Sequence, residues 1–157
     1  MELSKRLQAV ADMVEPGSIV ADVGCDHGYV SMYLVRKGIC PRVLAMDVNR
    51  GPLERAKEHV EEAGLSSYIE LRLSDGLKAL GWKTCADLAG NGELENTAVI
   101  TGKVQDTGNC LQPEADTLLT AGLGGRLASR ILEDSADKVR RMRWVILQPQ
   151  SEIWLVR

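Results

Sequence analysis

Apolar positions recur along the chain at two spacings, which predict alternating helices and strands. Helical spacing of apolar residues predicts helices at 3–14, 29–37, 52–63 and 126–139. Short apolar runs bounded by turn residues predict strands at 18–23, 42–47, 69–73, 116–121 and 144–147. Strands that alternate with helices in this way are typical of βαβ units. The pattern therefore predicts an α/β fold with a doubly wound, mostly parallel sheet, formed by one domain over residues 1–157.

Glycine and proline mark where several of these elements begin and end. Pro16-Gly17 forms a turn that ends the first helix, and Gly38 is placed to end the second. Pro52 is expected at the first position of the third helix, with Gly64 just beyond its last residue.

Two parts of the chain do not fit the alternating pattern. Residues 83–114 have no sustained periodicity and contain several glycines, so we expect an insertion or a flexible loop, with a short hairpin near 98–101 and 103–105 as an alternative. The chain also ends ten residues after Leu147, where the fifth strand is predicted to end. We therefore expect a sheet that is truncated at its C-terminal side.

Composition narrows the class of protein without identifying it. The 157 residues are 45% hydrophobic and 26% charged, as in ordinary globular proteins, and the net charge of −3 gives no overall attraction to nucleic acid. Residues 126–157 carry seven basic and four acidic side chains, a local balance of +3 that suits either a phosphate-facing edge or a solvated helix face. The sequence leaves the oligomeric state open.

Several kinds of site and location are not expected. No apolar run approaches the roughly 20 residues of a membrane span, and the N-terminus lacks the apolar segment of a signal peptide. We therefore expect a cytoplasmic protein that does not contact membranes. The cysteines show no metal-binding spacing, which predicts reduced thiols and no metal; they are Cys25, Cys40, Cys85 and Cys110.

The most informative segment is the turn after the first predicted strand. Gly24 and Gly28 allow a sharp turn and a close approach of a ligand to the backbone. Asp22 and Asp26 flank the turn and would repel a diphosphate, which argues against a nicotinamide dehydrogenase. The same carboxylates suit the sulfonium and ammonium charges of S-adenosylmethionine, so the turn favours a methyltransferase.

Carboxylates also follow the second and third predicted strands. Asp47 could accept hydrogen bonds from both hydroxyls of a ribose, and Asp75 could face an adenine amino group beside Gly76. Each aspartate alone could equally cap a helix or turn. Three of them at successive strand ends, with the glycine turn first, favour a nucleoside-type cofactor.

Other candidates for substrate binding lie near the first and fourth strands. His27 could orient a substrate or move a proton, or it could stack on the cofactor or cap the helix. Tyr29 could stack on a base or pack beside Tyr33. The turn at 122–125, Gly-Leu-Gly-Gly, leaves room for a flat ring and free N–H groups, or it simply begins a helix.

Several short motifs, in order, resemble the bacterial TrmK-type tRNA (adenine-22-N1)-methyltransferases. They are Leu-Ser-Lys-Arg-Leu at 3–7, Ala-Asp-Val-Gly-Cys-Asp-His-Gly-Tyr at 21–29, Gly-Pro-Leu at 51–53, Ser-Asp-Gly-Leu at 74–77, Ala-Gly-Leu-Gly-Gly at 121–125 and Leu-Gln-Pro-Gln at 147–150. The resemblance covers about residues 1–82 and 115–157. It implies a Rossmann-like class I methyltransferase fold, S-adenosylmethionine as cofactor, and methyl transfer to N1 of an adenine in tRNA.

The resemblance also implies roles for individual residues. Asp26 is the first candidate to stabilise the charge on the methylated adenine or to take a proton from its amine, and His27 is the second. The implied cofactor-binding residues are Asp22, Gly24, Cys25, Asp26, Gly28, Asp47, Val48, Asp75, Gly76, Ala121 and Gly122. The implied substrate-binding residues are Tyr29, Leu123, Gly124, Gly125, Gln148 and Pro149.

The sequence departs from the family pattern in three places. Residues 83–114 look inserted, the family's C-terminal helical domain is not expected in this sequence, and Gln150 stands where the family usually has Asn. Two alternatives therefore stay open beside a tRNA methyltransferase. One is a small-molecule methyltransferase, and the other is an inactive remnant that binds S-adenosylmethionine.

Overall fold

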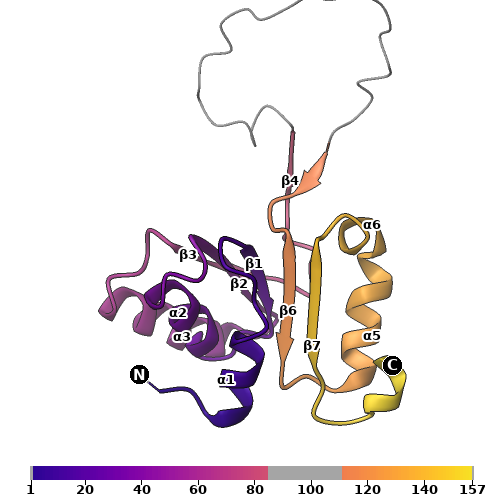
Figure 1. The fold of residues 1–157 in the computed structure, drawn as a ribbon, viewed down its shortest axis with the longest axis horizontal. Helices are drawn as coiled ribbons and strands as arrows, with labels where there is room; N and C mark the ends of the chain where they lie inside the picture. Colours follow the sequence, from indigo (N-terminus) through magenta and orange to yellow (C-terminus); the bar gives the residue numbers. More distant parts are fainter. Residues whose placement is uncertain (1, 85–110, 157) are drawn as a thin grey trace, which may run out of the picture.

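A five-stranded parallel sheet forms the centre of the molecule. The computed structural model describes residues 2–84 and 111–156. Strand order in the sheet is β3-β2-β1-β6-β7, and every neighbouring pair is parallel (Figure 1). The strands are β1 (Ile19–Val23), β2 (Arg42–Asp47), β3 (Ile69–Leu73), β6 (Thr117–Ala121) and β7 (Trp144–Gln148). The prediction of five parallel strands is confirmed, with each end within one residue of its expected position.

Alternating side chains along the strands bury both faces of this sheet, as in a doubly wound fold. Val20 and Val43 pack on one face with apolar residues of α1 (Lys5–Ala11), α2 (Tyr29–Arg36) and α3 (Arg50–Glu62). Their neighbours Ala21 and Leu44 point to the other face, where they pack with Ile131 of α5 (Gly125–Asp134). Helices therefore cover the two faces separately (Figure 1).

Three helix predictions need correction. The helix predicted over 3–14 is shorter: α1 has Ser4 as its N-cap and Asp12 as its C-cap, so it ends before the Pro16-Gly17 turn. Helix α3 begins at Arg50 rather than at Pro52, so the proline occupies the third helical position, where its missing N–H costs nothing because first-turn N–H groups have no intrahelical partner. The helix predicted over 126–139 is two helices, α5 and α6 (Ala136–Val139). Ser135 separates them with φ −126° and ψ 30°, outside the helical region.

A second, two-stranded sheet lies where the predicted insertion, residues 83–114, begins and ends. Strands β4 (Trp82–Lys83) and β5 (Gln112–Pro113) pair antiparallel. Two-residue strands carry no periodicity, so the sequence could not predict them. The hairpin considered near 98–105 lies outside the described residues.

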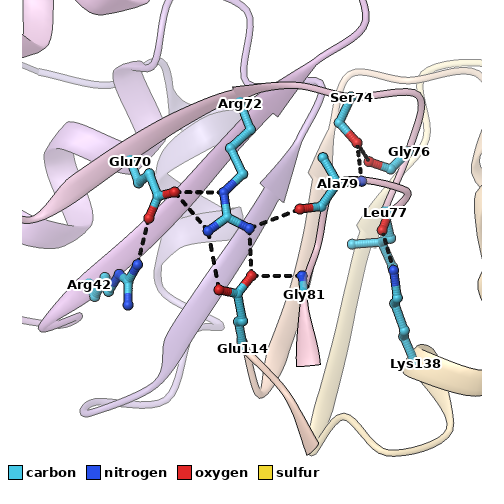
Figure 2. A network of polar contacts seen from close by, with 10 residues as sticks. All are labelled: Arg42, Glu70, Arg72, Ser74, Gly76, Leu77, Ala79, Gly81, Glu114 and Lys138. Carbon is cyan, nitrogen blue, oxygen red and sulfur yellow. Dashed lines mark hydrogen bonds and ion pairs between the residues drawn. The ribbon is translucent and has the colours of Figure 1, made fainter. Parts of the chain in front are cut away.

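A polar network joins the residues beside this two-stranded sheet to the main sheet (Figure 2). The Arg72 guanidinium on β3 donates to both carboxylate oxygens of Glu114 and to the carbonyl oxygen of Ala79 at 2.9 Å. Glu114 also accepts a hydrogen bond from the Gly81 N–H at 2.7 Å. The Glu70 carboxylate accepts hydrogen bonds from both Arg72 and Arg42. These contacts therefore tie Gly81 and Glu114, which flank β4 and β5, to strand β3 of the main sheet.

After β7 the chain turns back along α5. The Gly125 N–H donates to the Ser151 carbonyl at 2.8 Å, and Ser129 Oγ donates to the Leu155 carbonyl at 3.0 Å from the 3₁₀ helix η1 (Ile153–Val156). Among the described helices, none has the length and apolar content needed to span a membrane.

Candidate functional site

A cavity of about 440 Å³ opens at the carboxyl ends of the parallel strands. In doubly wound sheets ligands bind at this edge, at the point where strand order reverses, which here lies between β1 and β6. Each strand contributes a lining residue at or shortly after its end: Gly24 for β1, Asp47 for β2, Asp75 for β3, Gly122 for β6 and Gln150 for β7.

The glycine turn after β1 forms the floor of this cavity. Gly24 has φ +77°, and its N–H donates to the Met46 carbonyl at 2.8 Å. A Cβ at this position would lie 2.8 Å from the end of the Leu123 side chain, which could shift, so it is mainly the positive φ that favours glycine here. Asp26 also has a positive φ, +50°, and its side chain is 70% exposed.

Asp47 is the best-positioned carboxylate in the cavity. It is only 8% exposed. One oxygen accepts from the Asn49 N–H at 2.8 Å and the other from the Asp26 N–H at 3.3 Å. Each carboxylate oxygen has a second lone pair, so the pair can still accept two hydrogen bonds from a ligand. Two neighbouring hydroxyls are the group that such a fixed, two-oxygen acceptor fits.

Asp75 lies at the rim and has cationic partners that the sequence did not predict. Lys78 Nζ lies 2.6 Å from one oxygen and Arg130 3.0 Å from the other. These hydrogen bonds and charges, Lys78 first, lower the pKa of Asp75 below its usual value. Arg130 was noted in the sequence only as part of a basic stretch.

Hydrogen bonds from neighbouring side chains hold the turn that carries Asp75 (Figure 2). Ser74 Oγ donates to the Gly76 carbonyl at 2.8 Å and accepts from the Ala79 N–H at 3.0 Å. Lys138 Nζ donates to the Leu77 carbonyl at 2.8 Å. Gly76 has φ +61° and lets Ile131 approach to 3.1 Å from where a Cβ would lie. The turn is therefore held from several sides, and both Asp75 and Gly76 line the cavity.

Asp22 lies beneath the turn rather than in the main cavity. Alternation along β1 directs its side chain to the face covered by α2, where Ser31 Oγ donates to it at 2.6 Å. It is 2% exposed, and burial raises its pKa to about 6. The prediction missed this because the sequence of a strand buried on both faces does not show which face a given side chain points to.

A second, smaller cavity of about 80 Å³ lies on the other side of the glycine turn. Asp26 and Gly24 line both cavities. Asp26 is therefore the carboxylate that lies between them. The other predicted residues in the smaller cavity are Asp22, Cys25, His27, Tyr29 and Ala121, of which Ala121 also lines the larger one. Burial, followed by the nearby carboxylates, raises the pKa of the Cys25 thiol, so the group stays protonated.

His27 belongs to a row of three rings beside the smaller cavity. Its ring stacks on Tyr29 at 5.6 Å between centroids, and Tyr29 stacks on His59 at 5.4 Å. His59 Nδ1 lies 3.2 Å from the His27 carbonyl oxygen and donates to it, since a carbonyl only accepts. His27 Nε2 lies 3.6 Å from Asp26 Oδ1, and its Nδ1 is buried without a partner in the described part of the chain. His59 was not predicted, and its helical spacing carried no signal.

The predicted substrate residues are only partly gathered at the cavities. Leu123 lines the larger one. Gly124 and Gly125 line neither and instead let the chain after β7 pass close by. A Cβ on Gly125 would lie 2.2 Å from the Glu152 carbonyl oxygen. Gln148 and Pro149 also line neither cavity, and Gly28 serves as the left-handed residue that begins α2.

Several lining residues were not predicted from the sequence. Arg6 lines both cavities, while Asn49, Pro52 and Ser74 line the larger one. Arg6 and Gln150 stand in motifs that the resemblance already quoted, so the signal was present in the motifs and was not assigned to a role. Val48 and Gly122 were predicted and do line the larger cavity. No group of three or more His, Cys, Asp or Glu side chains among residues 2–84 and 111–156 is placed to hold a metal ion.

Comparison with known proteins gives a consistent set of relatives. The sequence matches the family described as a methyltransferase domain over residues 3–110 and 93–157. A curated relative from Bacillus subtilis (strain 168), tRNA (adenine(22)-N(1))-methyltransferase, is 33% identical over 149 residues, which are 95% of this chain and 50% of the relative.

Solved structures agree with this match. Streptococcus pneumoniae Sp1610 in complex with S-adenosyl-L-methionine is 33% identical with a TM-score of 0.70, and the match covers 94% of this chain and 56% of that one. The B. subtilis M1A22 tRNA methyltransferase TrmK is 30% identical with a TM-score of 0.72, covering 99% of this chain and 53% of that one. The chain thus spans about half the length of these relatives.

Proposed function

The chain belongs to the methyltransferase-domain family, and from this premise we propose that it binds S-adenosylmethionine in the larger cavity and transfers the methyl group to N1 of an adenine in tRNA. The relatives at 30–33% identity are described as tRNA m1A22 methyltransferases, and one was solved with S-adenosylmethionine bound. The position of Asp47 carries the proposal. Its carboxylate is nearly buried at the edge of the cavity and is held by two backbone N–H groups.

The residues around the larger cavity fit this cofactor in size and chemistry. A volume of about 440 Å³ lies within the roughly 300–1,000 Å³ of small-molecule sites. Asp47 would accept the two ribose hydroxyls. The turn at Ser74–Gly76 would face the adenine, and the Gly24 turn would lie under the amino-acid part. When bound, S-adenosylmethionine supplies a methyl group already activated on a sulfonium sulfur.

Electrostatics favour a cationic donor over a diphosphate. Asp22, Asp26 and Asp47 surround the Gly24 turn, and Coulomb attraction from their ionised forms would stabilise a sulfonium and an ammonium. A dinucleotide would place its pyrophosphate against the same carboxylates. The chain's residues therefore mainly position the reactants and stabilise charge.

Asp26 is placed to act on the adenine. It lines both cavities and is 70% exposed, so it can contact a base that approaches from the solvent side. As N1 is methylated the adenine becomes cationic. A carboxylate at hydrogen-bond distance from the exocyclic amine stabilises this charge and can take a proton. His27, 3.6 Å from Asp26, would orient that carboxylate.

Methyl transfer to a defined base tests the proposed function. An unmodified tRNA transcript with adenine at nucleotide 22 is incubated with the chain and radiolabelled S-adenosylmethionine, and the methylated position is mapped by the reverse-transcription stop that N1-methyladenine causes. We expect label and a stop at that nucleotide, both lost in a transcript that carries guanine there. Asp26→Asn is expected to lower kcat by about 10²-fold or more. Asp137→Asn, a change on α6 outside both cavities, is expected to leave it unchanged.

The same experiment separates the alternatives. If the chain binds S-adenosylmethionine but labels no tRNA, it is a cofactor-binding remnant or acts on small molecules, and the tRNA proposal is wrong. Label that appears on other adenines in equal amount would contradict the proposed position instead.

A further inference from the structure

We propose that Arg6 is the anion-binding residue of this site, and that its guanidinium pairs with the carboxylate on the amino-acid part of the methyl donor. The inference rests on the proposed function and assigns a role to a residue of the N-terminal helix α1. It follows from how Arg6 is held, from its missing charge partner and from its place between the cavities.

Neutral side chains hold the Arg6 guanidinium in place. Arg6 Nη1 donates to Gln148 Oε1. With its amide oriented to present oxygen, Gln150 accepts from Nη1 at 2.8 Å and from Nη2 at 3.1 Å. Gln148 Oε1 also accepts from the Gly122 N–H at 3.2 Å. The amides of Gln148, the last residue of β7, and of Gln150, just beyond it, therefore hold the guanidinium beside Gly122 in the turn after β6.

Arg6 differs from the other arginines of this region in its charge balance. Arg126 pairs with Glu152, Arg130 with Asp75, and neither is free to bind an anion without giving up a partner. None of the ion pairs found among the described residues includes Arg6. A guanidinium oriented by amides keeps its full charge for a ligand.

The position of Arg6 matches the end of the cavity where a carboxylate would lie. Asp75 at β3 and Asp47 at β2 define the adenine and ribose ends, so the amino-acid part extends toward β1 and β6. Arg6 lines the larger cavity there, beside Gly122. The cavity's other cationic lining residue, Arg130, is at the Asp75 end.

Charge at this end would otherwise oppose a zwitterionic ligand. The carboxylates around the Gly24 turn attract an ammonium and a sulfonium but repel a carboxylate. Arg6 is the described lining residue that offsets this repulsion. The charged groups of the donor would then lie apart, with its ammonium and sulfonium toward Asp26 and its carboxylate toward Arg6.

A pair of donors that differ only in the carboxylate tests this role. The Kd values of S-adenosylmethionine and of decarboxylated S-adenosylmethionine are measured by calorimetry for the wild type, Arg6→Gln and Arg6→Lys. We expect Arg6→Gln to weaken S-adenosylmethionine by about 10-fold to 100-fold and to leave the decarboxylated ligand unchanged. Arg6→Lys should restore part of the loss. Arg126→Gln, whose arginine lines neither cavity, should change neither Kd.

Other outcomes would overturn the inference in distinguishable ways. Equal weakening of both ligands would mean that Arg6 only holds the ends of β6 and β7 together. No change in either ligand, together with a raised KM for tRNA and a weaker salt dependence, would assign Arg6 to an RNA phosphate instead. If the folded wild type binds neither ligand, the proposed function itself fails. Thermal unfolding of each variant shows whether it is folded.

Discussion

Single residues at the glycine turn decide how charge is distributed around the proposed cofactor site. Asp47 remains an acceptor at the cavity edge, whereas Asp22, only two residues before Gly24, is enclosed by α2 and bonded to Ser31. The two aspartates would be equivalent candidates in sequence. Their burial separates them, because Asp22 is directed into the interior and its carboxylate loses most of its hydration.

The Asp22 pKa makes stability depend on pH. Its folded pKa of about 6 lies above the ordinary value of 3.8, so the folded state binds the proton more tightly than the unfolded state. Protonated Asp22 therefore stabilises the fold below about pH 4, and this contribution is lost as pH rises from 4 through 6. The change corresponds to at most about 3 kcal/mol.

Substituting Asp22→Asn should remove this pH-dependent contribution to stability. The amide oxygen still accepts from Ser31, and the amide carries no charge at any pH. We expect the free energy of unfolding of the wild type to fall relative to that of Asp22→Asn between pH 4 and pH 7. Urea unfolding at several pH values measures it. Parallel pH profiles for the two proteins would show that Asp22 does not titrate in this range.

At the level of helices and strands, hydrophobic periodicity predicted the main elements. It did not predict the features that depend on tertiary contacts. The five strands were predicted because each is a short segment dominated by apolar residues, which are mostly buried in β1, β2 and β6 and only partly buried in β3 and β7. The break at Ser135 between α5 and α6 was missed because apolar spacing continues across it. The pairing of β4 with β5 depends on Arg72 and Glu114, which lie 42 positions apart, so no local pattern reports it.

The junction between α5 and the chain after β7 depends on a glycine. Gly125 begins α5, and a Cβ there would lie 2.2 Å from the Glu152 backbone oxygen. Gly51 is a matched control, since it also lies in the first turn of a helix, α3, and a Cβ would meet no atom within 4 Å.

We expect opposite effects of the two alanine substitutions on the free energy of unfolding. Gly125→Ala should lower it by about 1–3 kcal/mol, because the C-terminal segment must move away. Gly51→Ala should raise it by about 0.5–1 kcal/mol, because alanine favours the helix. Denaturant unfolding of both variants and the wild type measures these changes in the free energy of unfolding. Equal effects of the same sign would mean that the segment does not pack on α5 as described.

At the scale of the whole molecule, the Rossmann-like methyltransferase fold predicted from the motifs is confirmed. The sheet order and the TM-scores of 0.70 and 0.72 to relatives at 33% and 30% identity agree with it. Gly24, Asp47, Asp75 and Gly122 were predicted from the sequence to lie at one site, and they line one cavity because each lies at or just after the end of a parallel strand. Arg6 joins them although it lies in α1, before the sheet; its motif at 3–7 was noted, but no strand end indicated where its side chain would lie.

The proposed function requires that the larger cavity bind S-adenosylmethionine through Asp47. Isothermal titration calorimetry of the purified chain with S-adenosylmethionine tests it, with Asp47→Asn as the site variant and Asp137→Asn as the matched control. We predict one site per chain for the wild type and for the control. Affinity should fall about 10-fold or more in Asp47→Asn, which loses the charge and one of the two acceptors for the ribose hydroxyls. No binding by the folded wild type, or equal affinity of wild type and Asp47→Asn, would contradict the proposed cofactor site.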